Sequence, residues 1–552
     1  LSMETIDNRV RDILRVKFLT GLFDTPYQTD LALADKEVNS EAHQQVALQA
    51  SREGLVLLKN ANNLLPLDKS QIKRIAVCGP NADEASFALT HYGPVAVEVI
   101  TVLEGIKQQV KEGTKVTYTK GCDLVDTNWP ESEIISYPLT AEEKTEIQKA
   151  VDNVKESDVA VVVLGGGIRT CGENKSRTSL DLPGHQQQLL EAIVATGKPV
   201  VLVLINGRPL SINWADKFVP AILEAWYPGS QGGTAIAEAL FGDYNPGGKL
   251  TVTFPKTVGQ IPFNFPAKPA SQVDGGQTPG MKGNQSRING PLYPFGYGLS
   301  YTTFEYSNLQ LSFPVITDKE PVTVTCKIKN TGTRSGDEVV QLYTRDVVSS
   351  VTTYEKNLRG FERVHLEPGE TKEVSFQLLP RDFQLLNKDN HWVVEPGMFQ
   401  IMIGASSEDI RLKKGLEIRA YGQASANEII ESDPRDFISA SKNKSHIIHV
   451  VDGDYSTTWK GEKGEYISFE LAENAKVDRI NVAWKNAEAG ARYEIQISSG
   501  GGQFLPVQRG EVTPNQEETI RFNKTGGSDL RILITNGSAE IAEIKLPELR
   551  KE

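Results

Sequence analysis

A single carboxylate stands at the centre of a long polar segment in the first half of the chain. Residues 165–184 begin with three consecutive glycines and follow the continuous apolar run 159–164. Glu173 lies at the middle of this segment, and two cations, Lys175 and Arg177, follow it. Long loops on a rigid scaffold are more often functional than decorative. The residues alone leave two interpretations open: Glu173 is a functional acid, or it is a solvated loop acid without a special role.

The three glycines do not indicate a nucleotide site. A dinucleotide-binding fingerprint needs GxGxxG at the opening of a helix, with an acid about 20 residues further on. Here Pro183 delays the next helix start too far for that spacing. The sequence also lacks Walker A, HExxH and GxSxG patterns. We therefore expect no nucleotide cofactor.

The elements around this segment alternate between helix and strand. Helical patterns cover 40–58, 102–110, 145–154, 185–196 and 232–240, and strand patterns cover 74–80, 116–118, 158–165, 199–206 and 221–225. Continuous Val, Ile and Leu strands between helices indicate a largely parallel sheet covered on both faces, a three-layer α/β sandwich. Function in such sheets usually lies in the loops after the strand carboxyl ends, which is where residues 165–184 fall.

The chain as a whole is predicted to be multidomain. Residues 1–35 open with an amphipathic helix and a linker, 36–265 form the α/β sandwich, and 266–304 form a second linker. Period-two alternation then predicts two antiparallel β-sandwich domains, 305–421 and 422–552. The first of them is expected to brace the α/β domain, with Trp392 in its core rather than as a sugar platform.

Charge and hydropathy exclude several classes of partner. The 59 Lys and Arg against 71 Asp and Glu give a net charge of -12, which disfavours nucleic acid as a partner. No apolar run approaches the roughly 20 residues that a membrane-spanning helix needs. The four cysteines, Cys78, Cys122, Cys171 and Cys326, are dispersed and are expected to be buried thiols.

A series of ordered motifs resembles glycoside hydrolase family 3, specifically its C-terminal α/β sandwich domain and the junction into its fibronectin type III domain. The motifs are SREGLVLLKN at 51–60, GPNA at 79–82, GENKSR at 172–177, LDLPG at 180–184, NGRP at 206–209, AWYPG at 225–229, GDYNPGGKL at 242–250 and YPFGYGLSY at 293–301. The resemblance covers residues 1 to about 420.

The resemblance implies a retaining, exo-acting β-glucosidase or β-xylosidase that acts on terminal β-linked sugars of oligosaccharides and needs no cofactor for catalysis. It carries Glu173 onto the general acid/base. It leaves Arg177 either a substrate-binding residue or a residue that pins the loop. In such an enzyme one carboxyl group attacks the anomeric carbon and a second one protonates the leaving oxygen.

The family's nucleophile lies on a (β/α)8 barrel, and residues 1–27 resemble only the last helix and exit strand of that barrel. We therefore expect this chain to be inactive alone and to need the barrel in cis or in trans. The resemblance also implies a periplasmic or secreted bacterial protein. A non-catalytic carbohydrate-binding or scaffold protein is the alternative, and the residues do not decide between glucose and xylose.

The last segment resembles the discoidin, or coagulation factor type C, module found among carbohydrate-binding domains. The resemblance rests on HVVDGDYSTTW at 449–459 and IAEI at 541–544, and it implies a structural Ca²⁺. Its ligands would be Asp452, Asp454, Thr457 and Glu543, hard oxygen donors that suit calcium. A plain Asp-Gly turn is the other interpretation. The aromatic residues available to stack on a sugar are Tyr455, Trp459, Trp484 and Tyr493, with Trp459 expected in the core.

Overall fold

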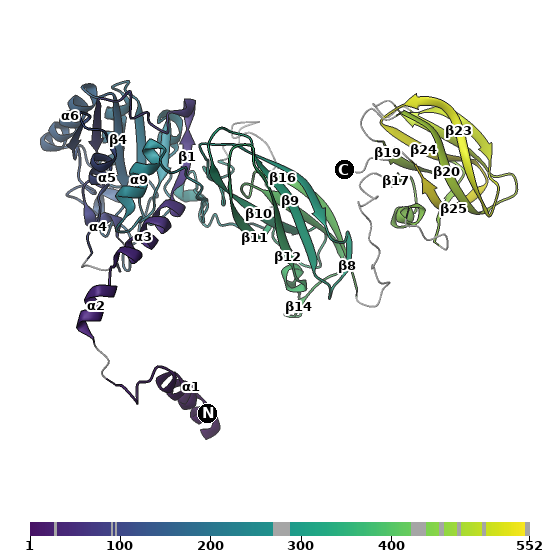
Figure 1. Ribbon diagram of the computed structural model, residues 1–552, viewed down its shortest axis with the longest axis horizontal. Helices are drawn as coiled ribbons and strands as arrows, with labels where there is room; N and C mark the ends of the chain where they lie inside the picture. The colour runs from purple at the N-terminus through teal and green to yellow at the C-terminus, as the bar shows by residue number, and fades with distance from the viewer. Residues whose placement is uncertain are drawn as a thin grey trace. The chain divides into compact units, whose positions relative to one another are not determined.

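The computed structural model describes residues 1–26, 30–89, 92–93, 97–268, 288–420, 438–451, 457–471, 476–498 and 504–546. The chain forms two compact units. The first comprises residues 1–265, 275–303 and 332–339, and the second comprises 266–274, 304–331 and 340–552. Figure 1 shows the α/β part in purple to teal and the two β-rich parts in green and yellow.

The first unit is built on a six-stranded sheet of order β1-β6-β5-β4-β2-β3. Its strands are β1 (Val56–Asn60), β2 (Arg74–Cys78), β3 (Lys115–Thr119), β4 (Val159–Gly165), β5 (Val200–Ile205) and β6 (Ala221–Glu224). All neighbouring pairs are parallel except β1 with β6. Every residue of β4, β5 and β6 is buried, which explains their continuous apolar sequences.

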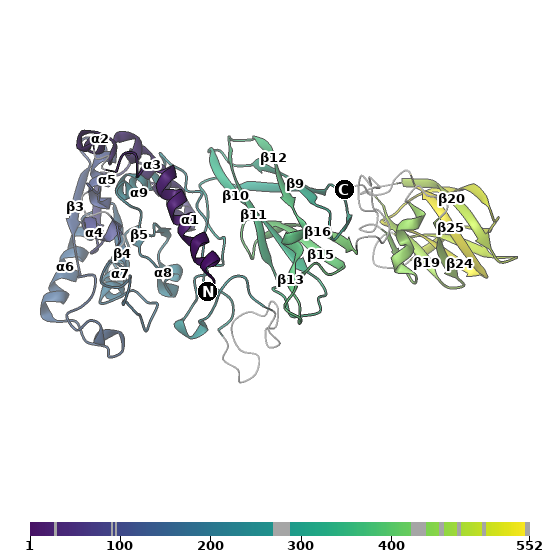
Figure 2. The ribbon, with the colours of Figure 1, turned by 90° about the horizontal axis from the view of Figure 1, so that it is seen from below.

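Helices cover both faces of this sheet. One face packs against α3 (Glu41–Gly54), α5 (Val102–Gln109) and α9 (Gly232–Phe241). The other packs against α6 (Ala141–Lys155), α7 (Gln186–Val194) and α8 (Asn213–Phe218). The layers can be followed in Figure 2, and the predicted three-layer sandwich with a mostly parallel sheet is confirmed.

The helix predicted over residues 40–58 is wrong at its end. Helix α3 ends at Gly54, and the next residues form strand β1, which pairs antiparallel with β6. The stretch 55–58 is buried throughout, so it shows no alternation of apolar and polar residues that would mark a strand. Sequence patterns cannot separate such a short buried strand from the continuation of a helix.

The strand order places a topological switch point between β2 and β4. The chain leaves β2 toward β3 on one side and leaves β4 toward β5 on the other. Open α/β sheets bind ligands at the carboxyl ends of the strands where the order reverses in this way. The segment after β4 therefore starts at the position where the fold most often carries a site.

The two β-rich domains are sandwiches, as predicted. The first pairs a sheet of order β11-β10-β15-β16-β8 with one of order β12-β9-β7, and the second pairs β17-β19-β24-β21-β22 with β18-β25-β20-β23. Neighbouring strands for which the register is given are antiparallel apart from β16 and β8.

The strands of the first sandwich are β7 (Phe304–Leu311), β8 (Val315–Thr317), β9 (Val322–Asn330), β10 (Gly336–Asp346), β11 (Asn357–Leu366), β12 (Thr371–Leu378), β15 (Gly397–Gly404) and β16 (Ile410–Arg419). Those of the second are β17 (Ile438–Ala440), β18 (Trp459–Glu462), β19 (Tyr466–Glu470), β20 (Lys476–Ala487), β21 (Arg492–Ser498), β22 (Phe504–Glu511), β23 (Gln516–Gly526), β24 (Asp529–Asn536) and β25 (Ser538–Lys545). Each sandwich encloses its own apolar core.

The predicted N-terminal helix is present as α1 (Met3–Leu19), followed by α2 (Leu31–Glu37). Helix α1 buries none of its residues, so its apolar side chains remain exposed. In the part of the chain that the structure describes, no helix combines the length and apolar character needed to cross a bilayer.

Candidate active site

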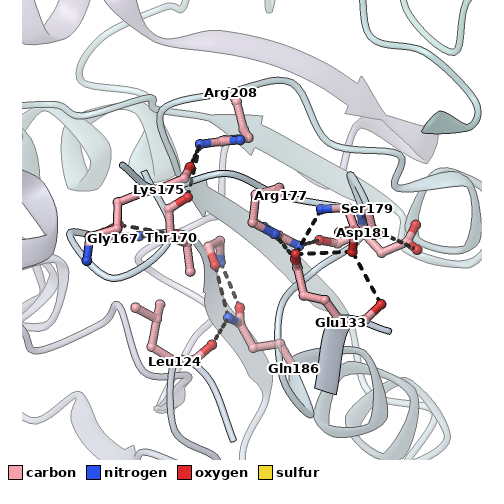
Figure 3. A network of polar contacts seen from close by, with 12 residues as sticks. Leu124, Glu133, Gly167, Thr170, Lys175, Arg177, Ser179, Asp181, Gln186 and Arg208 are labelled. Atoms are coloured by element: carbon pink, nitrogen blue, oxygen red, sulfur yellow. Dashed lines mark hydrogen bonds and ion pairs between the residues drawn. The ribbon is translucent and has the colours of Figure 1, made fainter. Parts of the chain in front are cut away.

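The segment after β4 is a loop whose two ends are tied together by one side chain. Gln186, fully buried at the start of α7, donates from Nε2 to the Gly165 carbonyl at 2.9 Å and accepts the Gly165 N–H at 2.8 Å. The same Nε2 donates to the Leu124 carbonyl at 2.8 Å. Figure 3 shows the Gln186 amide and its hydrogen bond to Leu124. The loop therefore leaves and re-enters the domain at a fixed point.

Hydrogen bonds also fix the first turn of the loop to the neighbouring strands. Asn81, buried in the loop after β2, donates from Nδ2 to the Gly166 carbonyl at 2.7 Å. Gly167 donates its N–H to the Thr170 hydroxyl at 3.0 Å, and the Thr170 N–H returns to the Gly167 carbonyl at 2.9 Å. The loops that flank the switch point are thus joined to each other directly.

The same edge of the sheet holds a buried carboxyl group at the end of β6. Glu224 accepts the Trp226 N–H at 2.9 Å and the Asn206 Nδ2 at 3.1 Å. Burial raises the pKa of Glu224 from 4.5 to about 8, against the lowering effect of those two hydrogen bonds. Trp226 has φ 56°, an unusual backbone conformation for a bulky residue. Glu224 therefore stabilises a strained turn, and burial favours its neutral form at pH 7.

The tip of the loop is a tight turn that presents Glu173 to solvent. The Lys175 N–H donates to the Gly172 carbonyl at 3.1 Å, and Asn174 between them has φ 61°, a conformation that Asn tolerates well. Glu173 is exposed at the corner of this turn. Its N–H donates to the hydroxyl of Tyr92, a residue between α4 (Ala85–Ala88) and α5, which ties the tip to that segment.

Arg208, which follows β5, holds both sides of the tip. Its Nη2 donates to the carbonyls of Thr170 and Lys175, each at 3.0 Å. These two carbonyls belong to residues on either side of Glu173 in the chain, and Figure 3 shows Arg208 beside Thr170 and Lys175. One guanidinium therefore restrains the turn from both directions, while the Glu173 carboxylate stays exposed and accepts the Tyr92 hydroxyl at 3.4 Å.

Arg177 lies inside the domain, although it is only four residues from Glu173. Its guanidinium forms an ion pair with Glu133, with side-chain exposures of 4% and 6%. It also donates to the Asp181 carbonyl at 3.0 Å and stacks over Trp129 with 5.3 Å to the ring centroid. Burial first, and the nearby Arg208 second, lower the pKa of Arg177 to about 10, so it remains charged at neutral pH. This arrangement favours the loop-pinning interpretation of Arg177 over substrate binding.

The predicted calcium ligands fall partly outside the described residues. Asp452 and Asp454 lie there, as does Tyr455, whereas Thr457 is partly exposed and Glu543 is buried on β25. Within the described ranges, no three His, Cys, Asp or Glu side chains gather in a metal-binding arrangement.

The aromatic residues depart from the expectation for a sugar site in the last domain. Trp459, Trp484 and Tyr493 are all buried in its core, at 0%, 2% and 2% exposure. In contrast Trp392 of the first sandwich, expected in the core, is 66% exposed. That expectation was wrong because Trp392 sits on a two-residue strand outside both sheets, where no period-two pattern can develop.

The cysteines agree with the prediction in three of four positions. Cys78, Cys122 and Cys326 are buried, and burial raises the pKa of Cys78 to about 12. Cys171 is partly exposed in the loop after β4.

Sequence reasoning missed most of the residues that support the loop. Gln186, Arg208, Glu133 and Glu224 act through contacts between distant segments, and none belongs to a spacing pattern with chemical meaning. Arg208 lies within the NGRP motif and Glu224 directly before the AWYPG motif, so the motifs marked the segments without revealing what the side chains do.

Taken together, the fold and the loop define a modular protein in which an α/β sandwich presents an exposed carboxylate beside a topological switch point. Three family models match the chain. They are the glycosyl hydrolase family 3 C-terminal domain at residues 55–301, a fibronectin type III-like domain at 338–407, and a NedA-like, galactose-binding domain at 449–532.

Similar proteins are glycosidases by name. The chain is 44% identical over 420 residues to a beta-xylosidase of Formosa agariphila, covering 74% of this chain and 55% of that protein. It is 39% identical over 432 residues to a periplasmic beta-glucosidase of Salmonella typhimurium, covering 75% of this chain and 55% of that protein. The crystal structure of a beta-glucosidase from Listeria innocua matches with 32% identity and a TM-score of 0.66, covering 76% of this chain and 56% of that one.

The chain therefore contains the C-terminal domain of glycosyl hydrolase family 3, followed by a fibronectin type III-like domain and a galactose-binding domain of the discoidin type. It spans about half the length of the curated relatives that it matches.

Proposed function

We propose that residues 36–265 supply the general acid/base, Glu173, of a retaining β-glycosidase that removes terminal β-linked glucose or xylose from oligosaccharides. The observation that carries the proposal is the position of Glu173: an exposed carboxylate on a restrained turn, beside the switch point of the sheet. A general acid must reach the glycosidic oxygen of a bound substrate, which a carboxylate held inside the domain would not do.

Glu173 would act twice in each turnover. As a carboxylic acid it protonates the leaving oxygen while a second carboxylate attacks the anomeric carbon. As a carboxylate it then takes a proton from the water that hydrolyses the glycosyl-enzyme. The two carboxyl groups of a retaining enzyme lie about 5 Å apart, so the turn must hold its position closely. The hydrogen bonds from Arg208 and to Tyr92 provide that restraint.

The nucleophile, in this proposal, belongs to a (β/α)8 barrel outside these 552 residues, in cis or in trans. The 552-residue chain by itself then lacks one of the two carboxyl groups and hydrolyses no glycoside at a measurable rate. Arg177 supports the loop through Glu133 and does not contact the sugar. The relative from Salmonella typhimurium is named periplasmic. By analogy we place this protein in the periplasm or outside the cell.

The proposal is tested by supplying the barrel of a family 3 enzyme, either mixed with the chain or fused ahead of Leu1. Hydrolysis of aryl β-glucoside and β-xyloside should appear only when both parts are present. Glu173→Gln should lower kcat by about 10²–10⁴-fold, because the proton donor is lost. Glu112→Gln, which removes an exposed carboxylate before β3 at the opposite edge of the sheet, should have no effect.

Equal activity of the Glu173→Gln and unchanged chains would contradict the proposal. So would the absence of activity from both the mixture and the fusion, combined with glycan binding by the chain. That combination would favour a non-catalytic carbohydrate-binding protein.

We further propose that the last domain holds a structural Ca²⁺ through Asp452, Asp454, Thr457 and Glu543. Carboxylate and hydroxyl oxygens are the hard donors that calcium prefers, and Glu543 is 7% exposed on β25. Calcium at about 100 times its Kd should stabilise the domain by about 2.7 kcal/mol, seen as a rise in Tm that EDTA reverses. The rise should vanish in Asp452→Asn and persist in Asp478→Asn, an exposed control on β20. A Tm insensitive to calcium in the unchanged chain would show that the 452–454 segment is a plain turn.

A further inference from the structure

A cleft on the fibronectin type III-like domain combines exposed aromatic rings with cationic side chains. Its volume is about 860 Å³, within the range of ligand-binding pockets. It is lined by Lys268, Val351, Thr352, Thr353, Tyr354, Asn357, Arg359, Arg381, Gln384, Leu385, Leu386 and Trp392. We propose that this cleft is a second glycan-binding site, separate from Glu173, that takes an oligosaccharide bearing a carboxylate, such as a uronic acid branch.

Trp392 is presented on a rigid support. Strands β13 (Leu385–Leu386) and β14 (Trp392–Val393) form an antiparallel ribbon in which Leu386 and Trp392 are directly opposite, so their side chains share a face. The turn between them is closed by Asn387, whose Oδ1 accepts the N–H groups of Asp389 and His391, each at 3.0 Å. The indole is 66% exposed on a hairpin whose turn is held by hydrogen bonds, which is a suitable support for stacking on an apolar sugar face.

Tyr354 provides a second aromatic surface, and it is 41% exposed. The Lys268 ammonium lies 5.8 Å from the centroid of its ring, a cation–π arrangement that orients the ring. The backbone next to it is also held, since the Glu355 N–H donates to the Ala267 carbonyl at 3.0 Å. A cleft with large aromatic surfaces left in solvent marks an interaction site rather than an ordinary piece of surface.

The charge of the cleft indicates an anionic ligand. Lys268, Arg359 and Arg381 line it, and its described lining contains no carboxylate, although the whole chain carries a net charge of -12. Burial lowers the pKa of Arg359, with Asp382 opposing that effect, so a bound anion would offset the cost of its desolvation. Guanidinium groups bind carboxylates through paired, charge-assisted hydrogen bonds.

The remaining polar lining suits sugar hydroxyls. Asn357 and Gln384 carry amides, and Thr352 and Thr353 carry hydroxyls, which can both donate and accept hydrogen bonds. Aromatic faces, partners for hydroxyl groups and three cationic side chains together fit an acidic oligosaccharide better than a peptide or a free anion. The choice of a glycan rests on the proposed function, whereas the preference for an anion rests on the cleft itself.

Calorimetric titration of the full 552-residue chain tests the proposal with a matched pair of probes. One probe is xylotetraose, and the other is the same chain with a glucuronic acid branch. The acidic probe should bind at least about tenfold more tightly, and added salt should remove most of this difference. Free glucuronate and inorganic phosphate should bind more weakly than the acidic oligosaccharide.

Three variants assign the binding to the cleft. Trp392→Ala should weaken the binding of both oligosaccharides at least about tenfold, because it removes the aromatic anchor that the bound sugar would cover. Arg381→Gln, which removes an exposed charge, should reduce the acidic probe to the affinity of the neutral one. Phe361→Ala, which removes an aromatic ring that is 67% exposed and does not line the cleft, should change neither affinity.

The proposal is overturned if both oligosaccharides bind equally, if phosphate binds as tightly as the acidic probe, or if neither oligosaccharide binds at millimolar concentration. Full binding by Trp392→Ala would also overturn it. Because binding is measured without turnover, Glu173→Gln should bind as the unchanged chain does. A failure of the proposed hydrolysis and a failure of this site are therefore distinguishable.

Discussion

The loop after β4 and the hairpin β13–β14 each hold a side chain in solvent, but they do so by different means. The tip that carries Glu173 depends on Arg208, which comes from a segment more than thirty residues away in the chain. The hairpin that carries Trp392 is closed mainly by Asn387, its own turn residue. One support is a tertiary contact and the other is local. Removing the first should therefore destabilise a larger part of its domain than removing the second.

A tertiary support links the geometry of the site to the stability of the whole domain. The side chains of Gln186, Arg208 and Arg177 each contact a segment that is distant in the sequence. A local support can fail without unfolding anything else, because only one turn depends on it. Variants of the two supports should therefore lose stability over different lengths of the chain.

The largest loss of stability is expected when the buried ion pair between Arg177 and Glu133 is broken. Arg177→Ala should lower the free energy of unfolding by about 3–5 kcal/mol, because Glu133 is then left buried without its partner. Adding Glu133→Gln in the same chain should recover part of that loss, since the orphaned charge is removed. Urea unfolding of the single and double variants measures both values.

Arg169→Ala is the matched control, because Arg169 is an exposed cation in the same loop. It should change stability by less than about 0.5 kcal/mol. If Arg177→Ala were equally mild, and weakened glycan binding instead, Arg177 would be a substrate-binding residue and the loop-pinning role would be wrong.

A smaller, pH-dependent change in stability is expected from the ionisation of Glu224. Its pKa is raised from 4.5 to about 8 in the folded domain, so between these values the folded state holds a proton that the unfolded state has lost. The contribution of protonated Glu224 to the free energy of unfolding is therefore fully present below about pH 4.5, and it is lost as the pH rises through 8. Tm measured from pH 5 to 9 should fall by several degrees through this group alone, and Glu224→Gln should flatten that part of the profile. An unchanged profile in the variant would show that Glu224 is ionised in the fold.

The smallest effects compare the two turns directly. Asn174→Ala should cost about 1 kcal/mol, because alanine tolerates φ 61° poorly, and Asn174→Gly should be nearly neutral. Asn387→Ala should cost about 1 kcal/mol through two lost hydrogen bonds. Hydrogen exchange should show the first change as increased opening of residues 166–185 and the second as opening confined to the 385–393 hairpin. Opening that spread beyond the hairpin would contradict the local character of its support.

The sequence predicted the fold well because the α/β domain and the sandwiches follow strong periodicities. The buried runs of β4 and β5 and the alternation in β9 and β12 each specify their element directly. The start of strand β1 was predicted as part of a helix because residues 56–58 are all buried, so both faces of the strand are apolar there. Patterns within a segment cannot report what the segment packs against.

The site was predictable only at its tip. Glu173 could be singled out as a lone carboxylate in a long loop, and the family resemblance gave it a role. Arg177, four residues later, is buried against Glu133 and Trp129, which belong to another segment. The sequence pattern around Arg177 does not predict these contacts. The exposure of Trp392 was missed for the same reason, since two-residue strands carry no periodicity.

The most direct test of the central claim is chemical rescue of Glu173→Ala in the chain fused to a family 3 barrel, with a dinitrophenyl β-glycoside and added azide. That leaving group needs no acid, so the account predicts a glycosyl-enzyme that accumulates and is released by azide as the β-glycosyl azide, with turnover restored. If Glu173→Ala hydrolyses the substrate at the unchanged rate without azide, or if azide has no effect on an impaired variant, Glu173 is not the acid/base.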